Sequence, residues 1–179
     1  MTQKLILVRH SISAPQPDLP QEAWQLTPEG ESRCVQLAEE VRPHAPQRIF
    51  TSTEAKAQST GKHLAQALRI PWQTAPDLQE TARGDEDYFA DKAAFAAAVE
   101  KAMRQPQQIL FGRETFADAK ARFMQQMRTL VQQHPGETLV LVSHGRVLSM
   151  VLGELLTRDP FTIWQEMPMP AYVVLEVPS

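Results

Sequence analysis

The sequence has one cysteine, Cys34, and only seven glycines among 179 residues. A single cysteine forms no disulfide within the chain, which is typical of proteins from a reducing compartment, so we expect a cytoplasmic protein. The glycines stand too far apart to write a GxGxxG fingerprint, a P-loop or a GxSxG elbow. The sequence therefore argues against a dinucleotide-binding Rossmann domain, a P-loop NTPase and a serine hydrolase.

Long apolar runs and runs of one charge are also missing. The longest apolar segment, 93–99, has seven residues, far fewer than the ~20 that span a bilayer. The N-terminus lacks the longer apolar stretch of a signal peptide. The formal charge is −3, and lysine and arginine form no cluster, so we expect neither a membrane nor a nucleic-acid partner.

The sequence does contain short, uninterrupted apolar segments that alternate with helical patterns. Such segments are typical of strands covered on both faces, and we expect strands at 5–8, 48–50, 139–142 and 172–175. Apolar spacing and capping residues predict helices at about 27–42, 54–68, 91–103, 116–133 and 146–156, and a short one that opens at 159–160. This order predicts an α/β fold in a single domain over 1–179, with an open, mostly parallel central sheet and helices on both faces.

Two histidines stand directly after predicted strands. Arg9 and His10 follow the strand at 5–8, and His144 and Gly145 follow the strand at 139–142. Ligands of open α/β sheets bind at the carboxyl ends of strands, so the pair marks a candidate site. Acidic residues at 85–87 lie in a polar stretch and are interpreted as a solvated loop, so we expect no metal and no cofactor.

Six segments in order carry a family resemblance. LILVRHSIS, LTPEG, TSTEAKAQST, DLQE, GRETFADAKARF and VSHGRVL span nearly the whole chain. Together they resemble the motifs of the histidine phosphatase superfamily. The resemblance implies a phosphoglycerate-mutase-like three-layer sandwich in which residues at about 81–113 form an insert that shapes the pocket.

The resemblance also implies an activity. The chain is expected to be a metal-independent phosphohydrolase acting on a phosphomonoester, either a small molecule or a phosphoprotein. His10 would take the phosphoryl group, His144 would stabilise its charge, and Glu80 would protonate the leaving group. The residues implied to bind substrate are Arg9, Lys56, Ser11, Arg83 and Gly145, with backbone donors expected at helix N-termini beyond Ser11 and Gly145.

The sequence departs from the family pattern at two of these positions. Lys56 stands where a second phosphate-binding arginine is common and lacks the bidentate geometry of arginine; Arg83 or Arg146 would compensate. Ser11 replaces the usual glycine, and two interpretations stay open: its hydroxyl donates to phosphate, or the backbone there simply tolerates a side chain. Two alternatives stay open: a phosphoglycerate-type mutase, and a catalytically weak relative that binds a phosphorylated ligand. The sequence specifies neither the substrate nor the oligomeric state.

Overall fold

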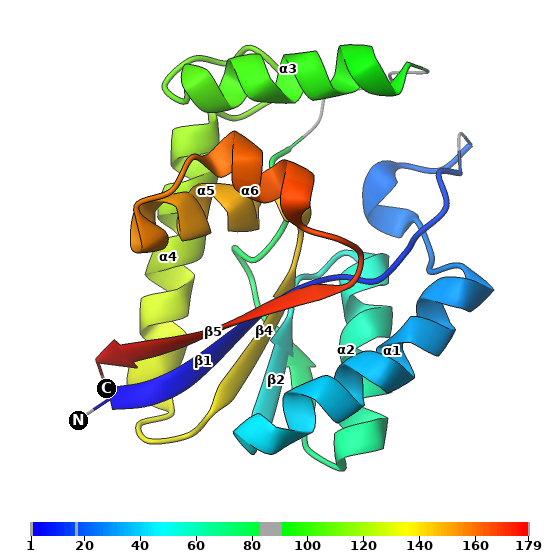
Figure 1. Ribbon diagram of the computed structural model, residues 1–179, viewed down its shortest axis with the longest axis vertical. Coiled ribbons are helices and arrows are strands. Elements are labelled where there is room, and N and C mark those ends of the chain that lie inside the picture. The colour runs from blue at the N-terminus through cyan, green and yellow to red at the C-terminus, as the bar shows by residue number, and fades with distance from the viewer. Residues whose placement is uncertain (1, 17, 83–90, 179) are drawn as a thin grey trace.

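A five-stranded sheet forms the middle layer of the computed structural model, which describes residues 2–16, 18–82 and 91–178 (Figure 1). The strand order is β3-β2-β4-β1-β5. All neighbours pair in parallel except β5, which runs antiparallel to β1 at the edge. The predicted α/β fold with a mostly parallel sheet is confirmed. The strands are β1 (Thr2–Arg9), β2 (Arg48–Thr51), β3 (Trp72–Thr74), β4 (Leu139–Ser143) and β5 (Ala171–Pro178).

Helices cover both faces of the sheet (Figure 1). On one face α1 and α2 pack together, and on the other α4 packs beside α5. Further from the sheet, α6 packs on α5 and α3 packs on α6. The predicted helices are all present: α1 (Pro28–Val41), α2 (Ala55–Leu68), α3 (Lys92–Arg104), α4 (Phe116–Gln133), α5 (Gly145–Leu156) and α6 (Pro160–Glu166), with 3-10 turns η1 (Gln21–Ala23) and η2 (Arg42–His44). Within the described ranges, every helix is too short or too polar to cross a bilayer.

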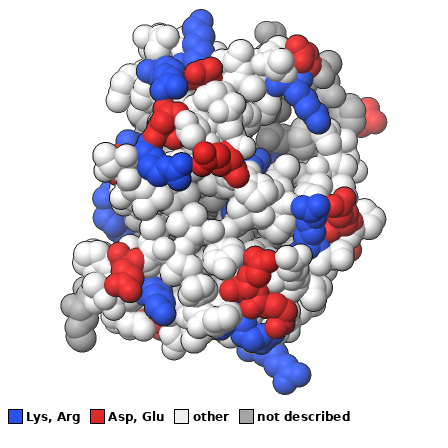
Figure 2. Space-filling model, viewed as in Figure 1, with Lys and Arg blue, Asp and Glu red and all other residues white. Residues whose placement is uncertain are grey.

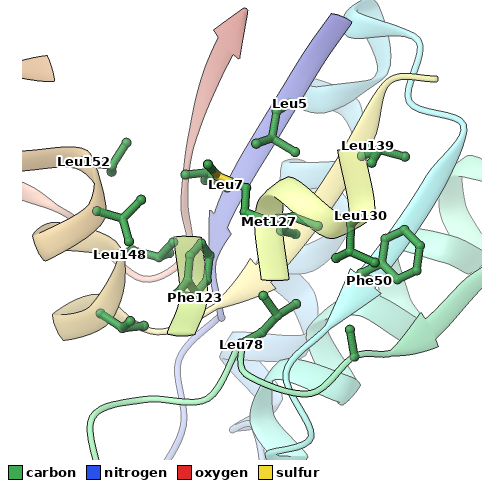
Figure 3. Close-up of a cluster of buried hydrophobic side chains, with 14 of the residues drawn as sticks. Leu5, Leu7, Phe50, Leu78, Phe123, Met127, Leu130, Leu139, Leu148 and Leu152 are labelled. Carbon is green, nitrogen blue, oxygen red and sulfur yellow. The ribbon is translucent and has the colours of Figure 1, made fainter. Parts of the chain in front are cut away.

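The central strands lie between two apolar cores. Leu5 and Leu7 of β1 point into the core under α4 and α5, whereas Ile6 and Val8 point into the core under α1 and α2. Figure 3 shows Phe123, Met127 and Leu130 of α4 packed in the first of these cores. Because successive strand residues face opposite sides of the sheet, burial on both faces explains the uninterrupted apolar segments.

Two strands differ from the sequence expectations. No pattern in the sequence predicted β3, whose three residues are all exposed and pair with β2. β5 was expected to be covered on both faces, but its residues are only half-buried or exposed. Both strands lie at sheet edges, where a strand buries less apolar surface and therefore leaves a weaker pattern in the sequence.

Gly30 of α1 sets the distance between this helix and the loop after β1. Thr27 caps the helix by accepting a hydrogen bond from the Gly30 amide at 2.9 Å. A Cβ on Gly30 would lie 2.2 Å from the Ile12 carbonyl oxygen, so only glycine permits this approach.

We expect Gly30→Ala to lower the free energy of unfolding by about 1–3 kcal/mol, because the helix or the loop must move. Alanine forms helices more readily than glycine, so helix propensity alone would raise the free energy of unfolding of the variant. Urea unfolding measures the change, with Ser32→Ala on the exposed side of α1 as the control. A Gly30→Ala protein as stable as the wild type would contradict the close approach.

Candidate active site

The pairing of β1 with β4 brings the two strand-end histidines together. Arg9 lies opposite Ser143 in the parallel register, and the His10 amide donates to the Ser143 carbonyl at 2.9 Å. The ring centroids of His10 and His144 are 5.1 Å apart. The sequence-predicted pair therefore meets at the carboxyl edge of the sheet.

His10 is buried in its neutral form. Its Nδ1 lies 2.7 Å from the Ser11 carbonyl oxygen, and since a carbonyl only accepts, the proton is on Nδ1. Burial lowers the pKa of His10 well below its ordinary 6.5, and the nearby His144, Lys56 and Arg9 lower it further. A neutral imidazole protonated at Nδ1 carries its free lone pair on Nε2, where it acts as a nucleophile.

His144 is the N-cap residue of α5, its side chain makes no capping hydrogen bond, and the segment after β2 holds its ring. Its Nε2 lies 2.8 Å from the Ser52 hydroxyl and 3.4 Å from Glu54 Oε1. Burial lowers the pKa of His144 to about 4, although Glu54 and Glu80 act in the opposite direction. Both histidines are therefore neutral near pH 7.

Glu54 is a site residue that the sequence analysis missed. The Glu54 side chain is 9% exposed, and its Oε2 lies 2.9 Å from Lys56 Nζ. The Lys56 side chain is 2% exposed. The Lys56 ammonium also donates to the Gln21 carbonyl at 3.0 Å and lies 5.5 Å from the Trp24 ring centroid. Lys56 thus lies in the polar cluster around the two histidines, where it pairs with a carboxylate, and its contact with substrate stays a prediction. The acidic residue two positions before Lys56 is the sequence feature that could have indicated this ion pair.

Breaking this buried pair has a large expected cost. Lys56→Met leaves the Glu54 carboxylate without its cation, and we expect the free energy of unfolding to fall by about 3–5 kcal/mol. The double variant Glu54→Gln/Lys56→Met removes both charges and should recover much of the loss. A double-mutant cycle by urea unfolding measures the coupling, and additive effects would show that the pair is not formed.

Arg9 and Gly145 fit against each other. A Cβ on Gly145 would lie 2.9 Å from Arg9 Cζ, so the glycine makes room for the guanidinium. Arg9 Nη1 donates to the Met167 carbonyl, and Arg9 Nε is buried without a hydrogen-bond partner among the described residues. Gly145 therefore makes room for Arg9 through its missing side chain, and the expected backbone donation to a ligand at this helix N-terminus stays a prediction.

Ser11 holds the loop after His10 onto the helices of one face. Its hydroxyl donates to the Gly30 carbonyl at 2.7 Å, and its amide donates to Thr60 Oγ1 at 3.0 Å. Residues 12–16 and 18–20 contain no helix. The expected helix N-terminus beyond Ser11 is therefore wrong, since the next helical turn begins at Gln21. Both polar groups of Ser11 have partners within the protein, and its contact with phosphate stays a prediction.

Glu80 lies beside the histidines, but its carboxylate is an acceptor. Oε1 accepts hydrogen bonds from the amides of Thr81 and Val147, and Oε2 accepts one from the amide of Arg146, each at 2.9 Å. The cation of Arg146 and these amides, together with His144, overcome the effect of burial and lower the pKa of Glu80 to about 2. The Glu80 carboxylate is therefore ionised near pH 7 and accepts from the amides of Arg146 and Val147 at the start of α5. Its role as a proton donor stays a prediction.

Arg146 and Arg122 fix the segment that carries Glu80. Arg146 Nε lies 3.4 Å from Glu80 Oε2, its Nη2 donates to the Thr81 carbonyl at 3.0 Å, and its guanidinium lies 5.0 Å from the Phe111 ring centroid. Arg122 of α4 donates to the Glu80 carbonyl at 2.9 Å. Arg83 and the acids at 85–87 lie outside the described residues.

Charge elsewhere is mixed. Figure 2 shows acidic and basic side chains side by side on one face, with a hollow below α3 that has basic atoms on its floor. Within residues 2–16, 18–82 and 91–178, no group of three or more His, Cys, Asp and Glu side chains is placed to hold a metal ion.

The buried histidines make stability depend on pH. The pKa of His144 is about 4 in the folded chain against the ordinary 6.5, so the unfolded chain binds the extra proton between these values. The free energy of unfolding therefore falls as pH drops from about 6.5 towards 4, and His10, whose pKa is also lowered, acts in the same direction. Glu80 acts only below its ordinary 4.5, since its stabilisation is lost as pH falls towards about 2.

Urea unfolding at pH 7 and pH 5 tests this dependence. We expect His144→Gln, which keeps a donor for Ser52, to remove up to about 2 kcal/mol of the loss between these two pH values. An unchanged pH dependence in the variant would show that His144 is protonated in both the folded and the unfolded chain at pH 5.

The fold and the site define a class: an α/β protein with a buried histidine pair among cations at the carboxyl edge of its sheet. Residues 5–177 match the family model of the histidine phosphatase superfamily (branch 1). The chain belongs to the histidine phosphatase superfamily, as its motifs indicated.

Relatives and solved structures agree with this assignment. The "uncharacterized phosphatase PhoE" of Bacillus subtilis is 25% identical over 131 residues, which are 73% of this chain and 64% of that protein. YhfR of Bacillus stearothermophilus superposes with a TM-score of 0.80 at 22% identity, over 99% of this chain and 92% of that one. A mycobacterial glucosyl-3-phosphoglycerate phosphatase superposes with a TM-score of 0.78 at 21% identity, over 98% and 91%. These likenesses confirm the phosphoglycerate-mutase-like fold.

Proposed function

We propose that this chain is a metal-independent phosphohydrolase that carries the phosphoryl group of a phosphomonoester on His10. One observation carries the proposal: the hydrogen bond from His10 Nδ1 to the Ser11 carbonyl, 2.7 Å long, which leaves the Nε2 lone pair free in a buried site. Among the described residues, Nε2 has no hydrogen-bond partner of its own. The neighbouring His144, Lys56 and Arg9 favour an anion at this position.

The reaction has two steps. His10 Nε2 attacks the phosphorus, the bond from phosphorus to the ester oxygen breaks, and the leaving group departs with the bonding electrons. Water then attacks the phosphorus of the phosphohistidine, the N–P bond breaks, and inorganic phosphate leaves as Nε2 regains its lone pair. The side chains around His10 supply the positive charge for both steps. A bound phosphoryl group also raises the affinity of His144 for a proton, and His144 then acts as a further cation.

The relatives support a phosphorylated substrate. PhoE is named a phosphatase, one structural neighbour is a glucosyl-3-phosphoglycerate phosphatase, and another is the putative phosphohistidine phosphatase SixA of Agrobacterium tumefaciens.

We also propose that residues 1–179 form one domain. In support of it, the Arg113 amide donates to the Ala82 carbonyl at 2.9 Å and closes the expected insert at its base.

A phosphatase assay with a small aryl phosphate in excess EDTA tests the proposal. We expect the wild type to turn over and His10→Ala to lose essentially all activity, because no other group replaces the nucleophile. His63→Ala on α2 is the control for removal of a histidine outside the site. Rapid quenching of the wild type should trap a phosphoenzyme that is labile in acid and stable in alkali.

Two results would contradict this function. Activity lost on chelation would replace the phosphohistidine route with metal-dependent hydrolysis. Binding of vanadate by the wild type, with no turnover and no phosphoenzyme, would favour the phospho-ligand-binding alternative.

A further inference from the structure

We infer, on the basis of the proposed function, that Glu54 is a positioning residue that acts through His144. Its carboxylate holds hydrogen on His144 Nε2, so that His144 takes up a proton on Nδ1 when a phosphoryl group binds. The imidazolium formed in this way is stabilised by a negative charge that is already in place.

The Glu54 side chain is directed into the site and away from its own helix. Glu54 is the N-cap residue of α2, yet its side chain makes no capping hydrogen bond. An acid at this end of a helix ordinarily interacts with the free amides of the first turn. Here Oε1 accepts from the Glu80 amide at 2.8 Å, and Oε2 lies 2.9 Å from Lys56 Nζ. The buried carboxylate therefore serves the surrounding side chains and not the start of α2.

Glu54 is ionised although it is buried. Burial acts to raise its pKa, but the charges of His144 and Lys56 and the hydrogen bond from the Glu80 amide lower the pKa below its ordinary 4.5. Glu54 is therefore a carboxylate near pH 7.

This carboxylate determines which ring nitrogen of His144 carries hydrogen. His144 Nε2 lies 2.8 Å from Ser52 Oγ, and a hydroxyl fits either tautomer because it both donates and accepts. A carboxylate only accepts, so Glu54 Oε1, which lies 3.4 Å from the same nitrogen, favours hydrogen on Nε2. The lone pair of neutral His144 is then on Nδ1, and this nitrogen takes up the proton when the ring becomes a cation.

The substrate itself supplies this proton. A phosphomonoester is present in part as the monoanion near pH 7, since its second pKa is about 6. Transfer of the proton to His144 Nδ1 gives an imidazolium and a phosphoryl dianion, and the net charge of the complex is unchanged. His10, whose ring centroid is 5.1 Å from that of His144, stays neutral because burial lowers its pKa, so it keeps the lone pair for attack.

The charged groups around His144 act in both directions. Burial has the largest effect and lowers the pKa of His144. Glu54 at the start of α2 and Glu80 after β3 act to raise it. Lys56 of α2 and Arg146 of α5 act to lower it further. Among these charges Glu54 has the largest effect, so removing it makes His144 harder to protonate, even when the charge of Lys56 is removed as well.

Titration of the phosphate complex by NMR tests this role on the full-length chain. The histidines are labelled with ¹⁵N, the protein is saturated with inorganic phosphate, and the ring nitrogens of His144 are followed between pH 5 and pH 9. We expect phosphate to raise the pKa of His144 in the wild type. In the phosphate complex of Glu54→Gln we expect this pKa to be lower by about 1–3 than in the wild-type complex. An unchanged pKa overturns the inference.

Glu137→Gln is the matched control. Glu137 also pairs with a cation, Arg48 at 3.0 Å, and also lies near a histidine, 3.7 Å from His134 Nδ1. It precedes β4, whereas His144 follows that strand. We expect this variant to leave the titration of His144 unchanged. An equal change in both variants would reflect the loss of any carboxylate and would count against a special role of Glu54.

The pH dependence of kcat gives a second readout, because kcat reports the pKa values of the enzyme–substrate complex. With an aryl phosphate, we expect the alkaline decline of kcat to begin at lower pH in Glu54→Gln. On that side of the profile kcat should be about tenfold or more below the wild type. A merely structural role of Glu54 would lower the stability of the variant and leave the pH profile in place.

Two measurements remain if Glu54→Gln does not fold. In the double variant Glu54→Gln/Lys56→Met, which removes both charges, His144 should still titrate at lower pH than in the wild type. In the wild type without phosphate, the ¹⁵N chemical shifts should show hydrogen on His144 Nε2. Hydrogen on Nδ1 in its place overturns the inference.

The inference and the proposed function can fail separately. His10-dependent turnover with an unchanged titration of His144 in Glu54→Gln overturns the inference alone. Phosphate binding with the expected change in titration, but without turnover or a phosphoenzyme, overturns the proposed function and leaves the effect of Glu54 on His144 in place. A chain that binds no phosphate overturns both.

Discussion

The parallel pairing of β1 with β4 is the constraint on which the site depends. Its register runs from Leu5 opposite Leu139 to Arg9 opposite Ser143, and a shift by one residue would exchange the side chains that enter each core. Side chains of both strands are packed in both cores. A shifted register would therefore require both cores to repack, with no gain in buried apolar surface. The apolar register therefore fixes the distance between His10 and His144, residues that lie 134 positions apart in the sequence.

Burying several charges beside two neutral histidines requires that each charge has a partner. An unpaired charge in such a place is costly, whereas a paired and hydrogen-bonded one is tolerated. Lys56 meets Glu54, and Arg146 meets Glu80. The two pairs are joined, because the Glu80 amide donates to Glu54. The site is thus one connected polar network, and a change at any member is transmitted to the others.

Sequence reasoning located the elements that bury most surface and missed those whose roles depend on distant partners. The apolar runs and the two histidines could be predicted because burial of a strand and the position of its end both leave a pattern in neighbouring residues. β3 was not, since its exposed residues at a sheet edge leave no apolar pattern. Glu80 was placed beside the histidines, yet its charge state depends on amides of α5 that are 66 and 67 residues away along the chain.

The amides of Arg146 and Val147 at the start of α5 bind an anion of the protein itself. A helix N-terminus at the edge of an α/β sheet is ordinarily open to an anionic ligand. Here the carboxylate of Glu80 occupies that position, so the helix stabilises an internal anion. That anion in turn holds Arg146, and Glu54 holds Lys56. In the proposed reaction, an incoming phosphoryl group would meet Arg9 as the cation without a carboxylate partner among these residues, and it would compete with Glu54 for Lys56. The cation without a carboxylate partner thus lies on the residue adjacent to His10, the proposed nucleophile, in the same chain segment.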